Sequence, residues 1–108
     1  MSGTISTLSH HVYFWLKNPD SKEDQAKLIS GVKTLINIET IKGFHIATPA
    51  ATEDRNVIDN SYSVSWLAFF DSEAEEQIYQ THPLHLKFIE EYGHLWSKVV
   101  VYDSLQAK

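Results

Sequence analysis

Three segments of this sequence carry large apolar or aromatic side chains at consecutive positions, and this limits most strongly what the chain can fold into. The segments are HHVYFWLK at 10–17, SYSVSWLAFF at 61–70 and KVVVYDSL at 98–105. They are rich in β-branched and aromatic residues and too short for helices, so they predict strands. Because side chains alternate between the two faces of a strand, each face would be apolar. A sheet built from these segments needs cover on both sides.

The first helix is predicted between the strand at 10–17 and a second, shorter strand. Ser21 is followed three residues later by Asp24, a spacing typical of a helix start. Apolar residues then recur with a helical period until the segment ETIKG. GFHIAT at 43–48 predicts the second strand, and the polar, turn-rich PAATEDRNVIDN at 49–60 predicts a surface loop.

Two more helices are predicted between the strands at 61–70 and 98–105. Ser72 and Glu75 repeat the capping signal and open an acidic helix that runs to Tyr79. Pro83 would break a helix interior but is tolerated in a first turn. A third helix therefore starts at about His82, whose ring could bond unpaired amides there.

The resulting order, βαββααβ, predicts an α+β, ferredoxin-like fold with a four-stranded antiparallel sheet and its helices on one face. The 108 residues predict a flexible leader at 1–8 and a single domain at 9–105. Since helices cover one face only, we expect the other to bind a second copy, sheet against sheet, in a two-fold homodimer. We assign to this interface Val12, Phe14, Leu16, Leu67 and Phe69.

Composition excludes several classes of function. The formal charge is −5 and the basic residues are scattered, so nucleic acid is not an expected partner. No cysteine is available for disulfides or thiolate sites. No apolar run approaches the roughly 20 residues that span a bilayer, and no signal-peptide pattern opens the chain. We expect a cytoplasmic protein with no membrane partner.

Tyr79 and His85 are the candidates for chemistry. An imidazole titrates near neutral pH, so His85 could take a proton from the carbon next to a carbonyl while the Tyr79 phenol stabilises the enolate oxygen. Alternatively, His85 only packs or caps, with its ring bonded to backbone or to Tyr79. The His82–His85 spacing has no third ligand nearby, and helix N-termini disfavour cations, so no metal is expected. No motif predicts a haem, flavin or other cofactor.

The same segments resemble the stress-responsive α/β-barrel family, Dabb. The resemblance lies in HHVYFWLK, in YSVSWLAFFDSEAEEQIYQTHPLHLKF and in HLWSKVVVYD, and it covers about residues 10–104. It implies a dimeric α+β barrel whose two sheets close back to back. Most of the family is uncharacterised, and its best understood enzyme is a polyketide cyclase that closes a ring by aldol condensation.

Carried over position by position, the resemblance implies that the strand-one histidine of the cyclase is His11, its pocket tyrosine Tyr79 and its catalytic histidine His85. A further pocket histidine is replaced by Val64. Alternation along the strand at 10–17 puts His10 on the side of the dimer interface or its edge, and His11, Tyr13 and Trp15 on the helix side. We predict a cavity on the helix side. Its expected lining residues are His11, Tyr13, Trp66, Tyr79, His85 and Trp96.

Three functions remain open at this point. The first is a small-molecule enzyme with acid–base chemistry of the cyclase, lyase or isomerase kind, acting on a carbonyl-containing or aromatic compound. The second is a non-catalytic ligand-binding protein or a structural, stress-associated dimer. The third is an oxygenase-like α+β barrel, with haem or without a cofactor. A cavity of at least ~300 Å³ would favour ligand binding, and a filled core would favour the structural role.

Overall fold

The order of elements agrees with the prediction. The computed structural model describes residues 7–107. The elements are β1 (Leu8–Leu16), α1 (Lys22–Lys33), the 3₁₀ helix η1 (Thr34–Asn37), β2 (Gly43–Ala47), β3 (Val64–Phe70), α2 (Glu73–Thr81), α3 (Pro83–Tyr92), the 3₁₀ turn η2 (Gly93–Leu95) and β4 (Trp96–Leu105). Of the predicted leader at 1–8, residues 1–6 lie outside the described part, and Leu8 already belongs to β1.

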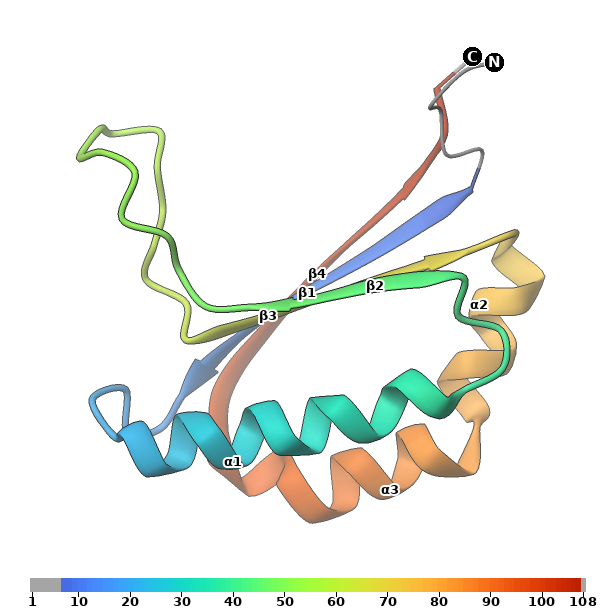
Figure 1. Cartoon of the computed structure of the whole chain (residues 1–108), viewed down its shortest axis with the longest axis horizontal. Coiled ribbons are helices and arrows are strands. Elements are labelled where there is room, and N and C mark those ends of the chain that lie inside the picture. Colours follow the sequence, from blue (N-terminus) through green and yellow to red (C-terminus); the bar gives the residue numbers. More distant parts are fainter. Residues whose placement is uncertain (1–6, 108) are drawn as a thin grey trace.

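The strands form one antiparallel sheet in the order β2-β3-β1-β4, and the helices cover one of its faces (Figure 1). This is the predicted ferredoxin-like α+β fold. We call the face away from the helices the open face. Among the described residues, no helix is both long and apolar enough to cross a membrane.

Local capping explains where the helices begin. Ser21 Oγ accepts a hydrogen bond from the amide three residues on at 3.1 Å, and Ser72 Oγ does the same at 3.2 Å. His82 Nδ1 accepts from the amide two residues on at 3.1 Å, and Pro83 occupies the first position of α3. These bonds satisfy amides that have no partner within the helix, so all three predicted starts are confirmed.

The core lies between the sheet and the helices. Its largest fully buried side chains are Trp66, Tyr79, Phe70, Leu28, Leu35, Ile38, Val32 and Val64. Helices α1 and α3 approach closely where Gly31 meets the ring of Tyr92. A Cβ at Gly31 would lie 2.6 Å from Cγ of that ring, closer than van der Waals contact allows. Only glycine fits this crossing without displacing the ring.

The two faces of β1 are the reverse of our prediction. Three residues assigned to the dimer interface are buried under the helices: Val12, Phe14 and Leu16. Three assigned to the helix side lie on the open face: His11, Tyr13 and Trp15. Alternation sorts a strand into two sets but does not say which set meets the helices. The register decides, because Val12 pairs with Trp66 and Phe14 with Val64.

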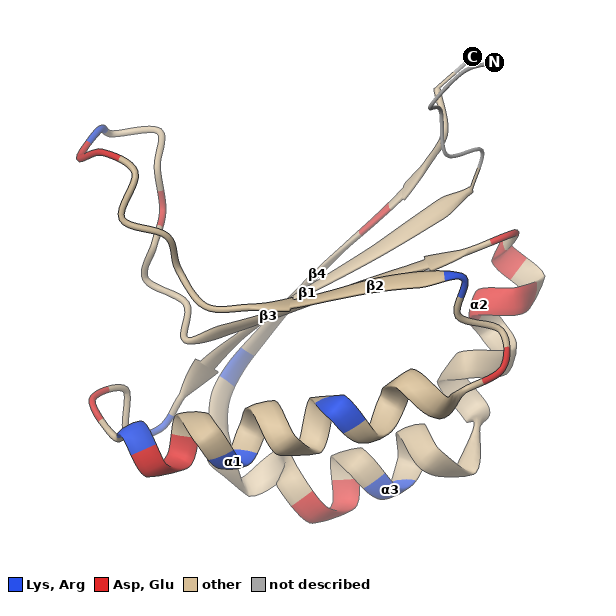
Figure 2. Cartoon of the chain, in the orientation of Figure 1, with Lys and Arg blue, Asp and Glu red and all other residues tan. Residues whose placement is uncertain are grey.

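The assignment for β3 is confirmed at the level of its faces. Leu67 and Phe69 alternate with the buried residues Trp66, Ala68 and Phe70, so they lie on the open face. Charged residues gather on the helices and on the loop after β2, whereas the strands carry few (Figure 2). The open face is therefore mostly uncharged.

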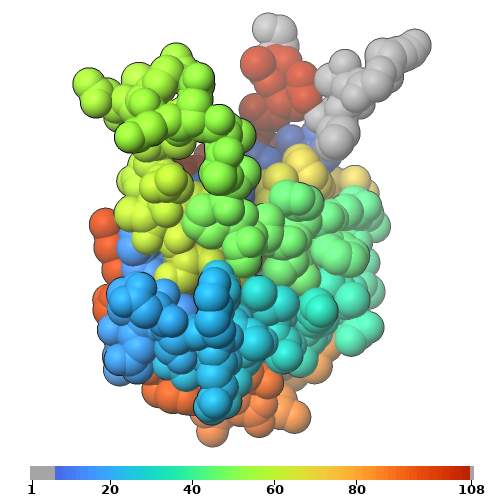
Figure 3. Space-filling view, turned by 60° about the vertical axis from the view of Figure 1, so that its left-hand side comes forward, coloured from blue at the N-terminus to red at the C-terminus, as the bar shows by residue number. Residues whose placement is uncertain are grey.

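The loop between β2 and β3 rises from the sheet on the side opposite the helices (Figure 1). We call residues 48–63 the arm. In the space-filling view the arm stands clear of the body, with β1 and β4 visible behind it (Figure 3). The predicted loop at 49–60 is thus real but longer, and it borders the open face.

Candidate functional site

A cavity of about 190 Å³ lies between the sheet and helices α2 and α3. Its lining residues are His10, Val12, Phe14, Trp66, Tyr79, Gln80, His85, Phe88, Ile89, Trp96, Val99 and Val101. Most of this wall is apolar, and the polar groups are two imidazoles, a phenol and an amide. At ~30 Å³ per water molecule the volume equals about six waters, below the ~300 Å³ we set for a typical ligand site.

His85 is fixed in one tautomer by the end of α2. Its Nδ1 lies 3.0 Å from the carbonyl oxygen of Gln80. Since a carbonyl only accepts, Nδ1 carries the hydrogen and Nε2 keeps a free lone pair. Burial lowers the pKa of His85, and the nearby His10 lowers it further, while the Gln80 bond and Glu76 act in the opposite direction. A neutral imidazole with an unprotonated Nε2 can act as a base at neutral pH.

Tyr79 lies beside His85 with its ring centroid 4.6 Å away. Trp66 Nε1 donates a hydrogen bond to Tyr79 Oη at 3.0 Å. Because that bond uses a lone pair of the phenol, the O–H hydrogen of Tyr79 is left to donate. Burial, the largest cause, raises the pKa of Tyr79, and the charge of Glu76 adds to this. The phenol therefore stays protonated and can serve as a hydrogen-bond donor.

His10 is the site residue that sequence reasoning missed. Its side chain is predicted on the side of the dimer interface, but its imidazole is buried on the helix side with 3% of its surface exposed. Its Nδ1 lies 2.6 Å from Asp103 Oδ1 and 3.7 Å from Glu76 Oε2. Its ring meets Tyr79 edge-on at 5.4 Å. Asp103 is the partner that orients this histidine.

The signal that could have found His10 is its place in the alternation. His10 lies two residues before Val12 and four before Phe14, so it shares their face. Once Val12 is paired with Trp66, His10 must face the helices with it. The prediction put His11 on the helix side, whereas the histidine that lies there is its neighbour His10.

The structure brings together four of the six predicted lining residues: Trp66, Tyr79, His85 and Trp96. The other two, His11 and Tyr13, were assigned to the wrong face. On the open face they contact each other, with Tyr13 Oη 3.2 Å from His11 Nδ1 and the rings stacked at 4.3 Å. Neither lines the cavity between sheet and helices.

The cavity opens between α3 and the edge strand β4. Ile89, Val99 and Val101 line it and are also substantially exposed. Strand β4 is the last strand of the sheet, and the helices contact β1, β2 and β3 more than β4. A ligand would enter across these three aliphatic side chains, so the entrance favours an apolar substituent.

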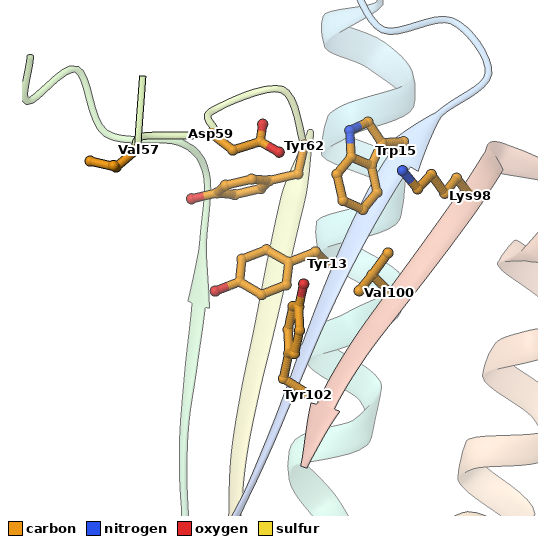
Figure 4. A pocket seen from close by; sticks show the side chains of 8 residues that line it. All are labelled: Tyr13, Trp15, Val57, Asp59, Tyr62, Lys98, Val100 and Tyr102. Carbon is orange, nitrogen blue, oxygen red and sulfur yellow. The ribbon is translucent and has the colours of Figure 1, made fainter. Parts of the chain in front are cut away.

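A larger hollow of about 420 Å³ lies on the open face, beside the arm (Figure 4). It is lined by Tyr13, Trp15, Val57, Asp59, Tyr62, Lys98, Val100 and Tyr102. Lys98 Nζ lies 4.5 Å from the centre of the Trp15 ring, a cation–π contact. Within residues 7–107, no three His, Asp or Glu side chains cluster as metal ligands.

Comparison with protein families identifies the chain. The model of the Stress responsive A/B Barrel Domain, Dabb, matches residues 8–105. The chain belongs to the Dabb family. The match spans all four strands and all three helices, so it confirms the resemblance seen in the sequence. No curated protein gives a match to this Dabb chain.

Solved structures share the fold at low sequence identity. A Dabb family protein with a ferredoxin-like fold from Mesorhizobium loti matches with a TM-score of 0.76 and 20% identity, covering 94% of this chain and 98% of that one. Hydroxynitrile lyase from Passiflora edulis matches with a TM-score of 0.75 and 23% identity, covering 95% of each. A dimeric ferredoxin-like protein of unknown function from Thermobifida fusca matches with a TM-score of 0.73 and 17% identity, covering 93% and 91%.

Proposed function

We propose that this Dabb protein binds a small carbonyl compound between its sheet and helices and performs acid–base chemistry on it. The observation that carries the proposal is the free Nε2 of His85 beside the protonated phenol of Tyr79. A base and a hydrogen-bond donor at one apolar cavity are the two groups that enolate formation needs.

The reaction follows from the two groups. His85 Nε2 takes a proton from the carbon next to the carbonyl group. In a cleavage reaction it takes the proton instead from a hydroxyl group, whose carbon becomes the carbonyl carbon of the product. Tyr79 donates its O–H to the oxygen on which negative charge develops. His10, oriented by Asp103, supplies a second imidazole at the same cavity. Cyclisation by aldol addition and isomerisation begin with removal of the carbon-bound proton, whereas carbon–carbon cleavage begins with removal of the hydroxyl proton.

Size narrows the substrate class. A cavity of about 190 Å³ favours a compound of few heavy atoms, with an apolar part directed toward the entrance between α3 and β4. The range of ~300–1,000 Å³ found for ligand and cofactor sites lies above this volume, so the residues fit a small substrate better than a haem or flavin. One similar fold, from Passiflora edulis, is a hydroxynitrile lyase, which supports lyase chemistry as a use of this architecture.

The test is exchange of carbon-bound hydrogen. Acetone and butanone, two small uncharged ketones, would be followed by proton NMR in D₂O with and without the protein. We expect catalysed deuterium incorporation that falls by about a hundredfold or more in His85→Gln, as for loss of a general base. His94→Gln, an exposed histidine outside the cavity, is the matched control and should keep the wild-type rate. No exchange above buffer with either compound would contradict catalysis and favour the ligand-binding or structural roles.

We also propose that the protein is a homodimer that pairs through the open face. Apolar and aromatic residues that are partly or largely exposed lie there on adjacent strands: Tyr13, Trp15, Leu67, Phe69, Val100 and Tyr102. A surface of this kind is uncommon on a monomer. Dimeric proteins of the same fold from Thermobifida fusca, Bacteroides fragilis and Jannaschia support a second copy as the cover.

A further inference from the structure

We infer that the arm, residues 48–63, is a clasp that closes on the second copy, whose surface fills the hollow on the open face. This inference rests on the proposed homodimer and is independent of the proposed acid–base chemistry. It assigns to a loop a role in assembly, and it assigns to the 420 Å³ hollow a protein occupant in place of a small molecule.

The base of the arm is held firmly to β1. Ser63 N donates to the Phe14 carbonyl oxygen at 2.7 Å, and Ser63 Oγ accepts from the amide of Leu16 at 3.1 Å. Trp15 Nε1 donates to Ser61 Oγ at 3.0 Å. These bonds fix the direction in which the arm leaves the sheet, so less conformational entropy is lost when it binds.

Ser61, which bonds to Trp15, also orients a carboxylate of the arm. Asp59 Oδ1 accepts from the backbone N–H of Ser61 at 2.9 Å and from its Oγ at 2.6 Å. The two Ser61 bonds, the larger causes, lower the pKa of Asp59, and Lys98 lowers it further. Asp59 is therefore charged at neutral pH and has a fixed position at the rim of the hollow.

The outer part of the arm presents an unpaired apolar side chain. Val57 is 79% exposed, the most exposed large hydrophobic residue of the described chain. Sixteen residues separate Ala47 from Val64. Because the loop must leave the sheet and return to it, only half of its residues contribute to its reach, which is at most ~26 Å at ~3.3 Å per residue. Two packed sheets lie only ~10 Å apart. An arm rising from the open face thus passes alongside any sheet packed on that face.

The charges around the hollow favour a second copy over a ligand. Lys98 and Asp59 both line it, and in Figure 4 they flank Trp15 and Tyr62. In a two-fold interface, if one residue contacts another across the interface, the reverse contact also forms. Asp59 of one copy can then meet Lys98 of the other, twice. A small anion would instead face the carboxylate, and a small cation the ammonium.

A mixing experiment tests this pairing. Asp59→Lys and Lys98→Asp would be prepared separately and their dimer dissociation constants measured by analytical ultracentrifugation, with circular dichroism to verify folding. Each variant alone places like charges together at both contacts, so we expect its dimer to weaken by about tenfold or more. Mixed together, the two should form a heterodimer of near wild-type affinity. Contacts within one chain cannot produce that rescue.

A control variant and the possible contrary results distinguish the proposed homodimer from the proposed clasp. Glu90→Lys reverses an exposed charge on α3, on the helix side, and should leave the dissociation constant unchanged. A wild-type protein that stays monomeric at all concentrations would overturn both the homodimer and the clasp. A wild-type dimer that the two variants leave intact, or that mixing fails to restore, would overturn the clasp alone. If the wild-type protein binds benzoate saturably and Lys98→Asp does not, the hollow is a small-molecule site, and the inference that a second copy fills it is wrong.

Discussion

His10 Nδ1 lies 2.6 Å from Asp103 Oδ1, which joins a fully buried imidazole of β1 to a half-exposed carboxylate of β4. The two residues are register partners on neighbouring strands, so the sheet itself brings them together. The bond fixes the ring of His10 at the cavity, where it meets Tyr79.

Removing this partner should cost stability. Asp103→Ala leaves a buried imidazole N–H without its acceptor, and we expect the free energy of unfolding to fall by about 1–3 kcal/mol. Asp103→Asn keeps an acceptor oxygen and should lose less. Urea unfolding followed by fluorescence measures both, and Glu90→Ala on exposed α3 is the control. Equal losses for Ala and Asn would contradict a role for the acceptor.

Tyr79→Phe should destabilise the protein and also slow the proposed proton transfer. The variant removes the acceptor of the Trp66 indole N–H, which is fully buried, and leaving that donor unpaired costs about 1–3 kcal/mol. Tyr92→Phe removes a hydroxyl from a partly buried ring elsewhere in the core and should change stability little. The prediction fails if both variants unfold at the same urea concentration.

Stability should decrease as the pH falls below about 6.5, the ordinary pKa of histidine. Burial lowers the pKa of both His85 and His11 in the folded protein. Between the unfolded and the folded pKa, the unfolded chain binds protons that the folded protein does not, so acid favours unfolding. Urea unfolding at pH 7.5, 6.5 and 5.5 measures this, and His85→Gln should flatten part of the slope. Equal stability at pH 7.5 and 5.5 would rule the idea out.

Gly31→Ala should destabilise the protein even though alanine is the better helix former. Alanine gains about 1 kcal/mol in helix propensity over glycine, but overpacking costs typically ~1–3 kcal/mol. The Tyr92 ring has no room for a methyl group at 2.6 Å. We therefore expect a net loss of about 1 kcal/mol. Ser30→Ala, on the exposed side of the same helix, should be neutral or slightly stabilising, and a gain at both positions would refute the close contact.

Leu67→Asp should separate the copies without unfolding them. Leu67 is only partly buried on the open face, so a charge there is tolerated by the monomer but not by an apolar interface. Val12→Asp, by contrast, puts a charge under the helices and should unfold the chain. Light scattering and circular dichroism distinguish the two results. A folded Val12→Asp monomer would restore our original assignment of the faces.

The candidate site shows where sequence reasoning reached its limit. Tyr79 and His85 both line the cavity, and the sequence could place them together because they lie close in the chain, on either side of Pro83. His10 was missed because its role depends on Asp103, 93 residues away. No local pattern joins these two positions. Their pairing exists only in the register of β1 with β4.

The sequence by itself determined the elements, their order and their boundaries to within a few residues, since capping, proline and alternation act between near neighbours in the chain. It also determined that the sheet is apolar on both faces. Only the tertiary structure decided which set of β1 side chains lies under the helices, and with it which of two adjacent histidines lines the cavity. The reason is that a strand with apolar side chains on both faces has no preference for which face packs against the helices. That choice is made collectively, by the cross-strand register and by which set of side chains fills the space beneath α1, α2 and α3.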